Sequence, residues 1–547
     1  MSTQEQLPGE NTPTANSLIE KESKTDDINQ IVADALANKT FKDYFLISCL
    51  CFLVAFGGFV FGYDTGTISG FVNMTDFIER FGSRGADGVA TLSSMRIGLM
   101  ISIFNIGCAL GGLVFAKVGD MKGRRIGLMF SMAIYVAGIA IQISSHDKWY
   151  QIMIGRFVTG LSVGIVSVIA PMFIGETSPK AVRGTLVCCF QLCITLGIFI
   201  GYCCTYGTKT LSDSRQWRIP LGLCFLWAIF LTVGMLFMPE SPRFLVEKKR
   251  IEDAKKSIAT VNKLSTEDPA VYAELQLIQA GVDREQLAGN ASWGELITGK
   301  PAIFRRVVMG VCLASLQQLT GINYFFYFAT TIFKAVGLED SFQTSIILGA
   351  VNFLSTFVNI WAIERFGRRL CLLVGAAGMF VCLIIYSGIG SKALYGTDSL
   401  GNETTNLTTG RAMIFVTCLY IFFFASTWAG GVFCILSETY PLRVRSKAMA
   451  VAIGANWLLG FTISLTSSFI INAIHFYYGF VFTGCLAAAF VFIYFCLNET
   501  KGLSLEEVDE LYAQKILPWK SASWVPPSAQ HMASSTGYAK SSQEHLV

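Results

Sequence analysis

Apolar runs of close to twenty residues recur along most of this chain, for example at residues 45–60, 126–143, 221–238 and 478–497. A helix of about twenty apolar residues is long enough to cross the hydrocarbon core of a bilayer, which is about 30 Å thick. Such runs are too many for a soluble domain held by a single anchor. The sequence therefore predicts an all-α membrane protein that crosses the bilayer many times.

The composition argues against several classes of partner and function. Charged residues make up 15% of the chain, against about 25% in soluble domains. The formal net charge is only +4, so we expect no nucleic-acid partner. Most of the sixteen cysteines lie in apolar runs and only four histidines occur, so we expect no disulfide framework, metal site or cofactor. We also expect no enzyme, since no paired catalytic groups stand out, and no cleavable signal peptide, since the first forty residues are polar.

The apolar runs predict twelve membrane helices, with boundaries uncertain by a few residues. They cover residues 44–71, 96–116, 126–144, 149–172, 184–205, 218–238, 304–333, 342–363, 370–390, 411–436, 446–470 and 475–497. A charged stretch with a helix-like run near residues 251–262 separates the sixth helix from the seventh. We therefore expect an N-terminal tail (1–43), an N-terminal six-helix half (44–238), an inter-half helical domain (239–303), a C-terminal six-helix half (304–497) and a C-terminal tail (498–547).

Basic residues in the short loops predict the orientation. They follow the second, eighth and tenth helices: Lys117, Lys122, Arg124 and Arg125; Arg365, Arg368 and Arg369; Arg443, Arg445 and Lys447. Basic short loops face the cytoplasm, so both tails and the inter-half domain are expected there too. Sequons at Asn73, Asn402 and Asn406 fall in predicted outer loops and are candidate glycosylation sites.

Motifs of the first half return at matching places in the second. The sequence Gly123-Arg124-Arg125 returns as Gly367-Arg368-Arg369, and Glu176-Thr177-Ser178-Pro179 returns as Glu438-Thr439-Tyr440-Pro441. In the latter pair an arginine, Arg183 or Arg445, follows the glutamate by seven residues. Pro239-Glu240 at the end of the first half is echoed by Asn498-Glu499 at the end of the second. Two homologous six-helix halves are the architecture of alternating-access transporters, whose site lies between the halves near the midplane.

In this order the motifs resemble the sugar porter family of the major facilitator superfamily, and within it the fungal hexose transporter branch. The resemblance covers about residues 44–515 and is carried by Gly123-Arg124-Arg125, Pro239-Glu240-Ser241-Pro242-Arg243, Gln317-Gln318-Leu319-Thr320-Gly321-Ile322-Asn323, Glu364-Arg365-Phe366-Gly367-Arg368-Arg369 and Glu499-Thr500-Lys501-Gly502. The chain departs from the family pattern at Gly430-Gly431, at Phe433, where mammalian relatives have Trp, and at Asn498, where the family usually has Pro. The first departures leave the preferred sugar open.

Amides buried in the predicted helices are candidate sugar ligands. An amide both donates and accepts hydrogen bonds, as a sugar hydroxyl does, without carrying a charge. Such amides can also merely join helices, and we favour that role for Asn359. Gln317 and Asn323 can face one cavity only if their helix unwinds between them, which Gly321 permits. The resemblance implies sugar contacts at Gln191, Gln317, Gln318, Asn323, Asn352, Phe433, Asn456 and Trp457, and a gate at Tyr327.

Charged residues supply two further hypotheses. Asp64 and Arg156 lie within predicted spans, where charges are costly and usually functional. Asp64 matches the coupling carboxylate of sugar-proton symporters, yet an Arg partner would keep it ionised as a structural pair. A cytoplasmic latch between the halves is implied for Arg124, Arg125, Glu176, Arg183, Glu240, Arg368, Arg369, Glu438, Arg445 and Glu499. Positive-inside topology explains these arginines but not the matched glutamates.

These observations predict a plasma-membrane carrier of a small neutral sugar, most simply a hexose uniporter. A sugar-proton symporter with the same site is the nearest alternative, and protons are then a second partner. A glucose sensor that signals without transport is an alternative of another class; the 47 residues from Lys501 to Val547 are few for such a sensor's tail. The oligomeric state is left open.

Overall fold

A computed structural model describes residues 45–84, 88–178, 183–287, 292–326, 341–392, 395–397, 403–405, 407–503 and 505–525. The chain forms two compact units, Met1–Leu50 with Pro239–Gly289, and Cys51–Met238 with Asn290–Val547. The second unit holds nearly all of the membrane helices.

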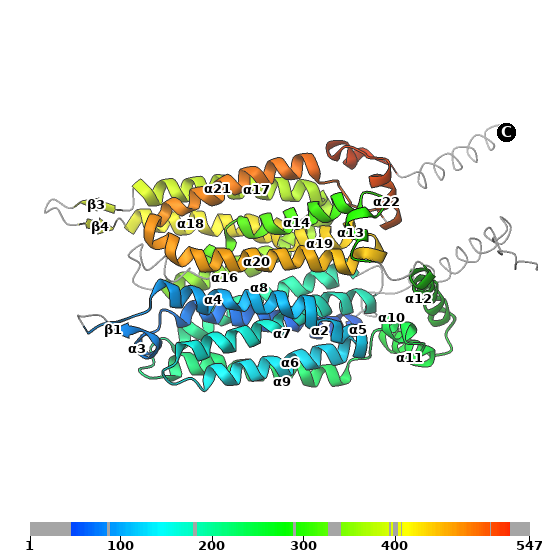
Figure 1. Cartoon of the computed structure of the whole chain (residues 1–547), viewed down its shortest axis with the longest axis horizontal. Helices are drawn as coiled ribbons and strands as arrows, with labels where there is room; N and C mark the ends of the chain where they lie inside the picture. The colour runs from blue at the N-terminus through cyan, green and yellow to red at the C-terminus, as the bar shows by residue number, and fades with distance from the viewer. Residues whose placement is uncertain are drawn as a thin grey trace, which may run out of the picture. The chain divides into compact units, whose positions relative to one another are not determined.

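The first half of the chain supplies six long helices (Figure 1). They are α2 (Phe45–Phe71), α4 (Ser94–Leu110) with its continuation through a π-helical turn η1 (Gly111–Phe115) into α5 (Lys117–Lys122), α6 (Arg124–Ile143), α7 (Trp149–Thr177), α8 (Arg183–Thr208) and α9 (Arg215–Phe237). The loop between α2 and α4 contains α3 (Thr75–Phe81) and the two-stranded hairpin of β1 (Ser83–Arg84) and β2 (Ala90–Thr91).

The second half repeats this arrangement. It contains α13 (Glu295–Thr298), α14 (Ile303–Leu319), α16 (Ser341–Phe366), α17 (Arg368–Lys392), α18 (Leu407–Phe423) continuing through the π turn η2 (Phe424–Trp428) into α19 (Ala429–Thr439), α20 (Leu442–Ile474), η3 (His475–Tyr477) and α21 (Tyr478–Cys496). Strands β3 (Tyr395–Thr397) and β4 (Glu403–Thr405) pair between α17 and α18, and α22 (Leu505–Ala513) and η4 (Pro518–Ser523) follow the last span.

Eleven helices in the described part of the chain are long and apolar enough to cross a membrane. The predicted helix at 304–333 is the one missing from this set: α14 ends at Leu319, residues 322–326 are helical again, and its remainder lies outside the described residues. The all-α membrane fold is therefore confirmed. Several helices exceed the predicted bounds, as α20 does at both ends, because polar residues continue a helix beyond its apolar core.

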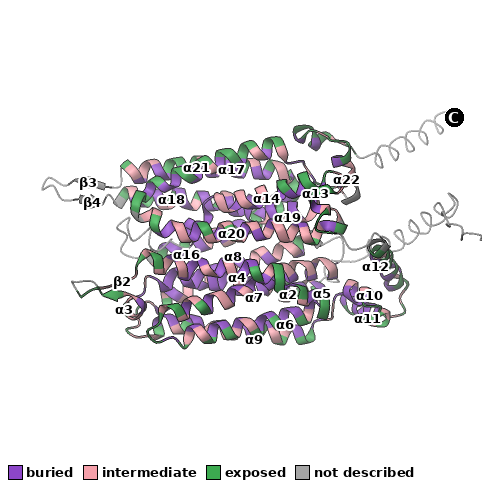
Figure 2. Cartoon of the chain, in the orientation of Figure 1, coloured by how far each residue is buried: buried purple, intermediate pink, exposed green. Residues whose placement is uncertain are grey.

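Exposure separates outer helices from inner ones (Figure 2). In α9 and α21 only 33% of an 18-residue apolar stretch is buried inside the protein, against 61% in α7. The exposed side chains of the outer helices are themselves apolar, such as Ile229 and Val491. Large apolar residues exposed on a membrane helix face lipid.

Close packing inside the first half depends on glycine. A Cβ atom at Gly107 on α4 would lie 2.3 Å from the Phe157 carbonyl oxygen on α7, and one at Gly160 would lie 2.3 Å from that of Phe104. Only glycine permits backbones to approach so closely, as in the small-residue interfaces of membrane helices. The helices α4 and α7 are therefore in close backbone contact.

The two halves meet along α4 with α20 and α8 with α16 (Figure 1). Near the end of the bundle that carries the two hairpins, the Tyr202 hydroxyl donates to the Phe326 carbonyl at 2.9 Å and Gln343 Nε2 donates to the Tyr206 hydroxyl at 3.2 Å. Deeper in the bundle, Thr356 donates to Thr195 at 3.3 Å. Hydrogen bonds therefore link the halves at several depths.

The inter-half segment is helical, as predicted, with α10 (Pro242–Glu247), α11 (Ile251–Asn262) and α12 (Pro269–Leu287). Its small core includes Phe244, Leu245, Ile258 and Val271. Beside this core Lys255 is 8% exposed, and its ammonium donates to Glu267 Oε1 at 3.2 Å. This hydrogen bond, and a second one from Tyr272, lower the pKa of the Glu267 carboxyl. The exact boundaries of this domain remain a prediction.

Candidate sugar site

The site begins at a break in α14. The helix ends at Leu319, and Gly321 adopts φ +90° before residues 322–326 become helical again. A Cβ atom at Gly321 would also lie 2.6 Å from the Phe482 ring. Glycine is therefore required both for its backbone conformation and for space. The predicted interruption of this helix is confirmed.

The break brings amides into one hydrogen-bonded chain. Asn323 Nδ2 donates to Gln318 Oε1, and Gln318 Nε2 donates to Asn456 Oδ1 on α20 at 2.7 Å. Asn456 Nδ2 donates to Gln317 Oε1 at 3.0 Å, and Gln317 Nε2 donates to the Trp428 carbonyl at 3.0 Å. Four amides predicted from the sequence thus form a continuous network across α14, α20 and η2.

The two ends of this network differ in burial. Gln317 and Asn456 are each only 5% exposed, and Asn456 also donates to the Ala314 carbonyl at 2.8 Å. Gln318 and Asn323 are half-buried. The inner amides therefore hold the outer two in position, and the outer two residues remain partly exposed.

The first half adds an amide that the sequence reasoning missed. Asn105 on α4 is 1% exposed, and its Nδ2 donates to Ser464 Oγ on α20 at 3.4 Å. A Cβ atom at Gly460 would lie 3.5 Å from Gln318 Oε1 and 3.6 Å from Asn105 Nδ2. Asn105 and Gln318 therefore approach Gly460 from opposite halves. The signal was present in the sequence, since Asn105 is an amide inside the predicted helix 96–116.

Other predicted contacts lie apart from this chain of hydrogen bonds. Asn352 on α16 is 2% exposed, and its Oδ1 has no hydrogen-bond partner among the described residues. The same holds for the buried Trp457 Nε1, whose ring lies 5.7 Å from that of Phe61. Gln191 on α8 is half-buried, and Phe433 is 40% exposed. Buried polar atoms without partners are costly, and a sugar contact at Asn352 and Trp457 stays a prediction.

Two further predicted residues have different outcomes. Asn359 Nδ2 donates to the Thr427 carbonyl at 3.2 Å and is 1% exposed. It therefore ties α16 to η2, in agreement with the packing role expected for it. Tyr327, the predicted gate, lies outside the described residues.

Asp64 on α2 and Arg156 on α7 form an ion pair in which each residue is 1% exposed. Arg156 Nε also donates to the Met100 carbonyl at 3.3 Å, and its guanidinium lies 4.6 Å from the Phe104 ring centre. Removing one member of such a pair strands a buried charge and costs about 3–5 kcal/mol. The pairing foreseen for these two residues is therefore present and belongs to the packed interior of the first half.

The repeated motifs build the same ion pair in each half. Arg124 holds Glu176 with two hydrogen bonds of 3.0 Å, and Arg368 holds Glu438 with bonds of 3.1 and 2.7 Å. Two-point contacts of this kind are among the strongest arginine–carboxylate interactions. Each pair joins helices of one half. A latch between the halves stays a prediction.

Several of the remaining latch candidates form hydrogen bonds with backbone groups. Glu499 accepts the backbone N–H groups of Arg368 at 2.9 Å and Arg369 at 3.0 Å, so it caps the start of α17. The guanidinium of Arg125 donates to the Met238 carbonyl, that of Arg369 to Tyr494 and that of Arg445 to Tyr440. Glu240 accepts the Ser241 N–H at 3.0 Å. The Arg183 side chain lies outside the described residues.

Of the candidate glycosylation sites, the structure describes Asn73. Its Nδ2 donates to the Ser69 carbonyl at 3.2 Å, just beyond α2. Asn402 and Asn406 lie outside the described residues. Within the described ranges, no group of three or more His, Cys, Asp or Glu side chains is placed to hold a metal.

Comparison with known proteins places this site in context. Residues 50–512 match the family described as "Sugar (and other) transporter". The chain is 56% identical over 510 residues to a low-affinity glucose transporter of Kluyveromyces lactis, covering 93% of this chain and 90% of that one. It is 56% identical over 485 residues to the high-affinity hexose transporter HXT6 of Saccharomyces cerevisiae, covering 89% and 85%.

Solved structures share the fold. The inward-open xylose transporter XylE of E. coli matches with a TM-score of 0.67 at 24% identity, over 85% of this chain and 99% of that one. The proton:xylose symporter XylE bound to 6-bromo-6-deoxy-D-glucose matches with a TM-score of 0.71 at 24% identity, over 86% and 100%. At 24% identity these two matches show that the chain shares the fold of XylE.

Proposed function

The chain belongs to the sugar transporter family, and from this premise we propose that it carries a hexose across the plasma membrane by alternating access. The observation that carries the proposal is the amide chain from Asn323 to Gln317 across the break in α14. Neutral groups that donate and accept suit a neutral polyol. The relatives named as glucose and hexose transporters support a hexose as the substrate.

The expected affinity fits a carrier. About five hydrogen bonds worth about 0.5–1.5 kcal/mol each supply about 2.5–7.5 kcal/mol, from which the cost of ordering the sugar is subtracted. Millimolar binding needs about 4 kcal/mol, which lies within this range. We place Gln191, Gln318, Asn323, Asn352 and Trp457 at the sugar, with Asn105 as the contact from the first half.

For energy coupling we propose facilitated uniport. Asp64 is fully buried against Arg156, while the amide network accounts for sugar binding without a carboxylate. A symporter needs a carboxylate whose pKa crosses the ambient pH during each cycle. Proton symport is the second candidate, since Asp64 lies in a span, where ionisable groups are usually functional.

We further propose that both termini, residues 239–303 and the end of the bundle carrying α5 and α22 are cytoplasmic. The support is the cluster of Arg124, Arg368 and Arg369 at that end.

Uptake of a non-metabolised hexose analogue in cells lacking their own hexose transporters tests the mechanism. A uniporter equilibrates the analogue, continues after a protonophore collapses the proton gradient and exchanges preloaded sugar. Accumulation above the external concentration, abolished by the protonophore and by Asp64→Asn, would establish symport instead. Absence of flux with the protein at the cell surface would favour the sensor.

A further inference from the structure

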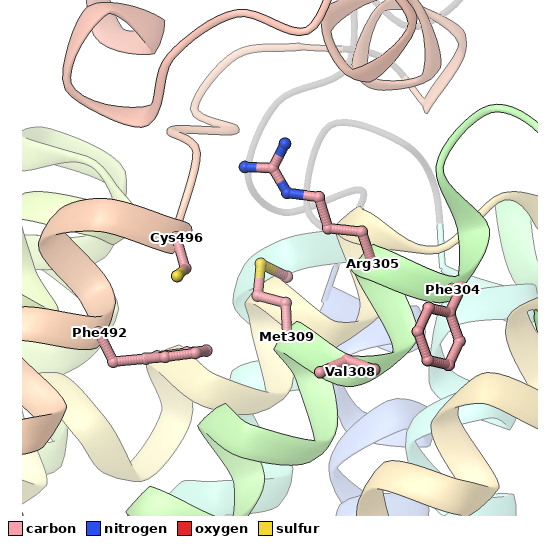
Figure 3. A pocket seen from close by; sticks show the side chains of 6 residues that line it. All are labelled: Phe304, Arg305, Val308, Met309, Phe492 and Cys496. Atoms are coloured by element: carbon pink, nitrogen blue, oxygen red, sulfur yellow. The ribbon is translucent and has the colours of Figure 1, made fainter.

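A cavity of about 280 Å³ lies between the first turns of α14 and the last turns of α21 (Figure 3). It is separate from the amide network, which lies near the other end of α14. Its walls are formed by Phe304, Arg305, Val308 and Met309 of α14 and by Phe492 and Cys496 of α21.

The outer wall of this cavity belongs to the lipid-facing surface. Phe304 is 53% exposed and Val308 42% exposed, and the neighbouring Val491 and Phe495 of α21 are 54% and 53% exposed. Exposed apolar side chains at a membrane-helix surface meet acyl chains. The cavity therefore offers an apolar slot to a molecule already dissolved in the bilayer.

Two adjacent arginines at the start of α14 differ in burial and in their charge partners. Arg306 is 0% exposed, forms an ion pair with Asp509 and lies 4.2 Å from the Tyr512 ring centre. Arg305 is exposed and has no hydrogen bond or ion pair with any residue in the described ranges. Figure 3 shows its guanidinium at one end of the apolar slot. The protein thus neutralises one charge and leaves the other at the rim of the cavity.

The same end of the cavity has a positive local charge. Burial raises the pKa of the Tyr512 hydroxyl to about 12, while the charges of Arg306 and Arg305 act in the opposite direction. Asp509, the acidic group there, is already paired with Arg306. A ligand with a negative headgroup meets an available guanidinium and no available carboxylate among these residues.

We propose that this cavity binds one anionic phospholipid, with its phosphate on Arg305 and an acyl chain between α14 and α21. A guanidinium suits phosphate because it can donate two parallel hydrogen bonds. Basic pockets at the membrane surface recognise anionic headgroups in this way. The lipid then packs against α14, which carries Gln317 and Gln318 just before its break.

Native mass spectrometry of the purified full-length protein in detergent tests the proposal, with dioleoylphosphatidylserine and dioleoylphosphatidylcholine as the added lipids. The wild type should retain one phosphatidylserine at concentrations where phosphatidylcholine is lost. Arg305→Gln should reduce this occupancy about fivefold or more, since it removes the charge-assisted contact. Val308→Trp should reduce it by filling the slot, and Val308 is exposed enough to accept the larger side chain.

Arg365→Gln is the matched control, because Arg365 is an exposed arginine at the end of α16 and its loss changes the net charge equally. It should leave phosphatidylserine binding unchanged. Equal retention of the two lipids, unchanged binding by Arg305→Gln, or an equal loss with Arg365→Gln would each overturn the proposal. Displacement of the lipid by an equal concentration of soluble glycerophosphoserine would also overturn it, since the acyl chain in the slot would then contribute nothing.

Discussion

Gln318 gives the sharpest test of the amide network, because its side chain occupies the middle of the chain of hydrogen bonds. It accepts from Asn323 and donates to Asn456 at 2.7 Å. Gln318→Ala removes both bonds and leaves Asn323 without the partner that orients it. At about 0.5–1.5 kcal/mol for each bond, the loss amounts to about 1–3 kcal/mol. Because about 1.4 kcal/mol is a tenfold change in binding, we expect the KM for hexose uptake to rise by about fivefold to a hundredfold.

Asn359→Ala is the matched control for this substitution. Asn359 is also a buried amide in a membrane helix, but it donates to the Thr427 carbonyl and has no part in the chain of amides. We expect its loss to lower thermal stability, by about 1 kcal/mol of unfolding free energy, and to leave KM within about twofold.

The assay is the initial rate of radiolabelled glucose uptake over a range of concentrations, in cells without other hexose carriers. Surface expression is measured in parallel with a fluorescent fusion, so that changes in KM are separated from changes in protein amount. Normal kinetics in Gln318→Ala, or an equal rise of KM in Asn359→Ala, would refute the distinction between sugar-binding and packing amides.

Three further predictions concern other parts of the molecule. Gly321→Ala should abolish most uptake, since φ +90° and the Phe482 ring both exclude a Cβ atom. The backbone strain alone costs about 1–3 kcal/mol. Wild-type transport by this variant would contradict the requirement for glycine at the break. Arg368→Gln should lower the melting temperature in detergent, because it removes the ion pair with Glu438. Arg368→Glu with Glu438→Arg should recover part of the loss, whereas no change in either variant would show that the pair contributes nothing to stability. Epitope tags at both termini should be labelled only after the cells are permeabilised, and labelling of intact cells would reverse the topology.

The sequence alone determined the features that depend on local pattern. Apolar runs near the thickness of a bilayer predicted the membrane helices, and the matched Gly-Arg-Arg motifs predicted the two halves. Gly321 between Gln317 and Asn323 predicted the break, because both amides can face one cavity only if the helix unwinds between them. The run at 251–262 coincides with α11. Each of these signals lies within a few neighbouring residues.

The tertiary structure decided which polar groups meet. Gln318 and Asn456 are 138 positions apart, and Asn105 and Ser464 are 359 apart. Their contacts depend on the rotation of each helix about its axis and on how the halves pack, and neither follows from hydropathy. For that reason the sequence pattern did not identify Asn105 as a site residue. For the same reason the adjacent arginines of one motif have different partners: Arg368 binds a carboxylate and Arg369 binds a backbone carbonyl. Hydropathy places a helix in the membrane, but only packing against other helices determines what each of its faces touches.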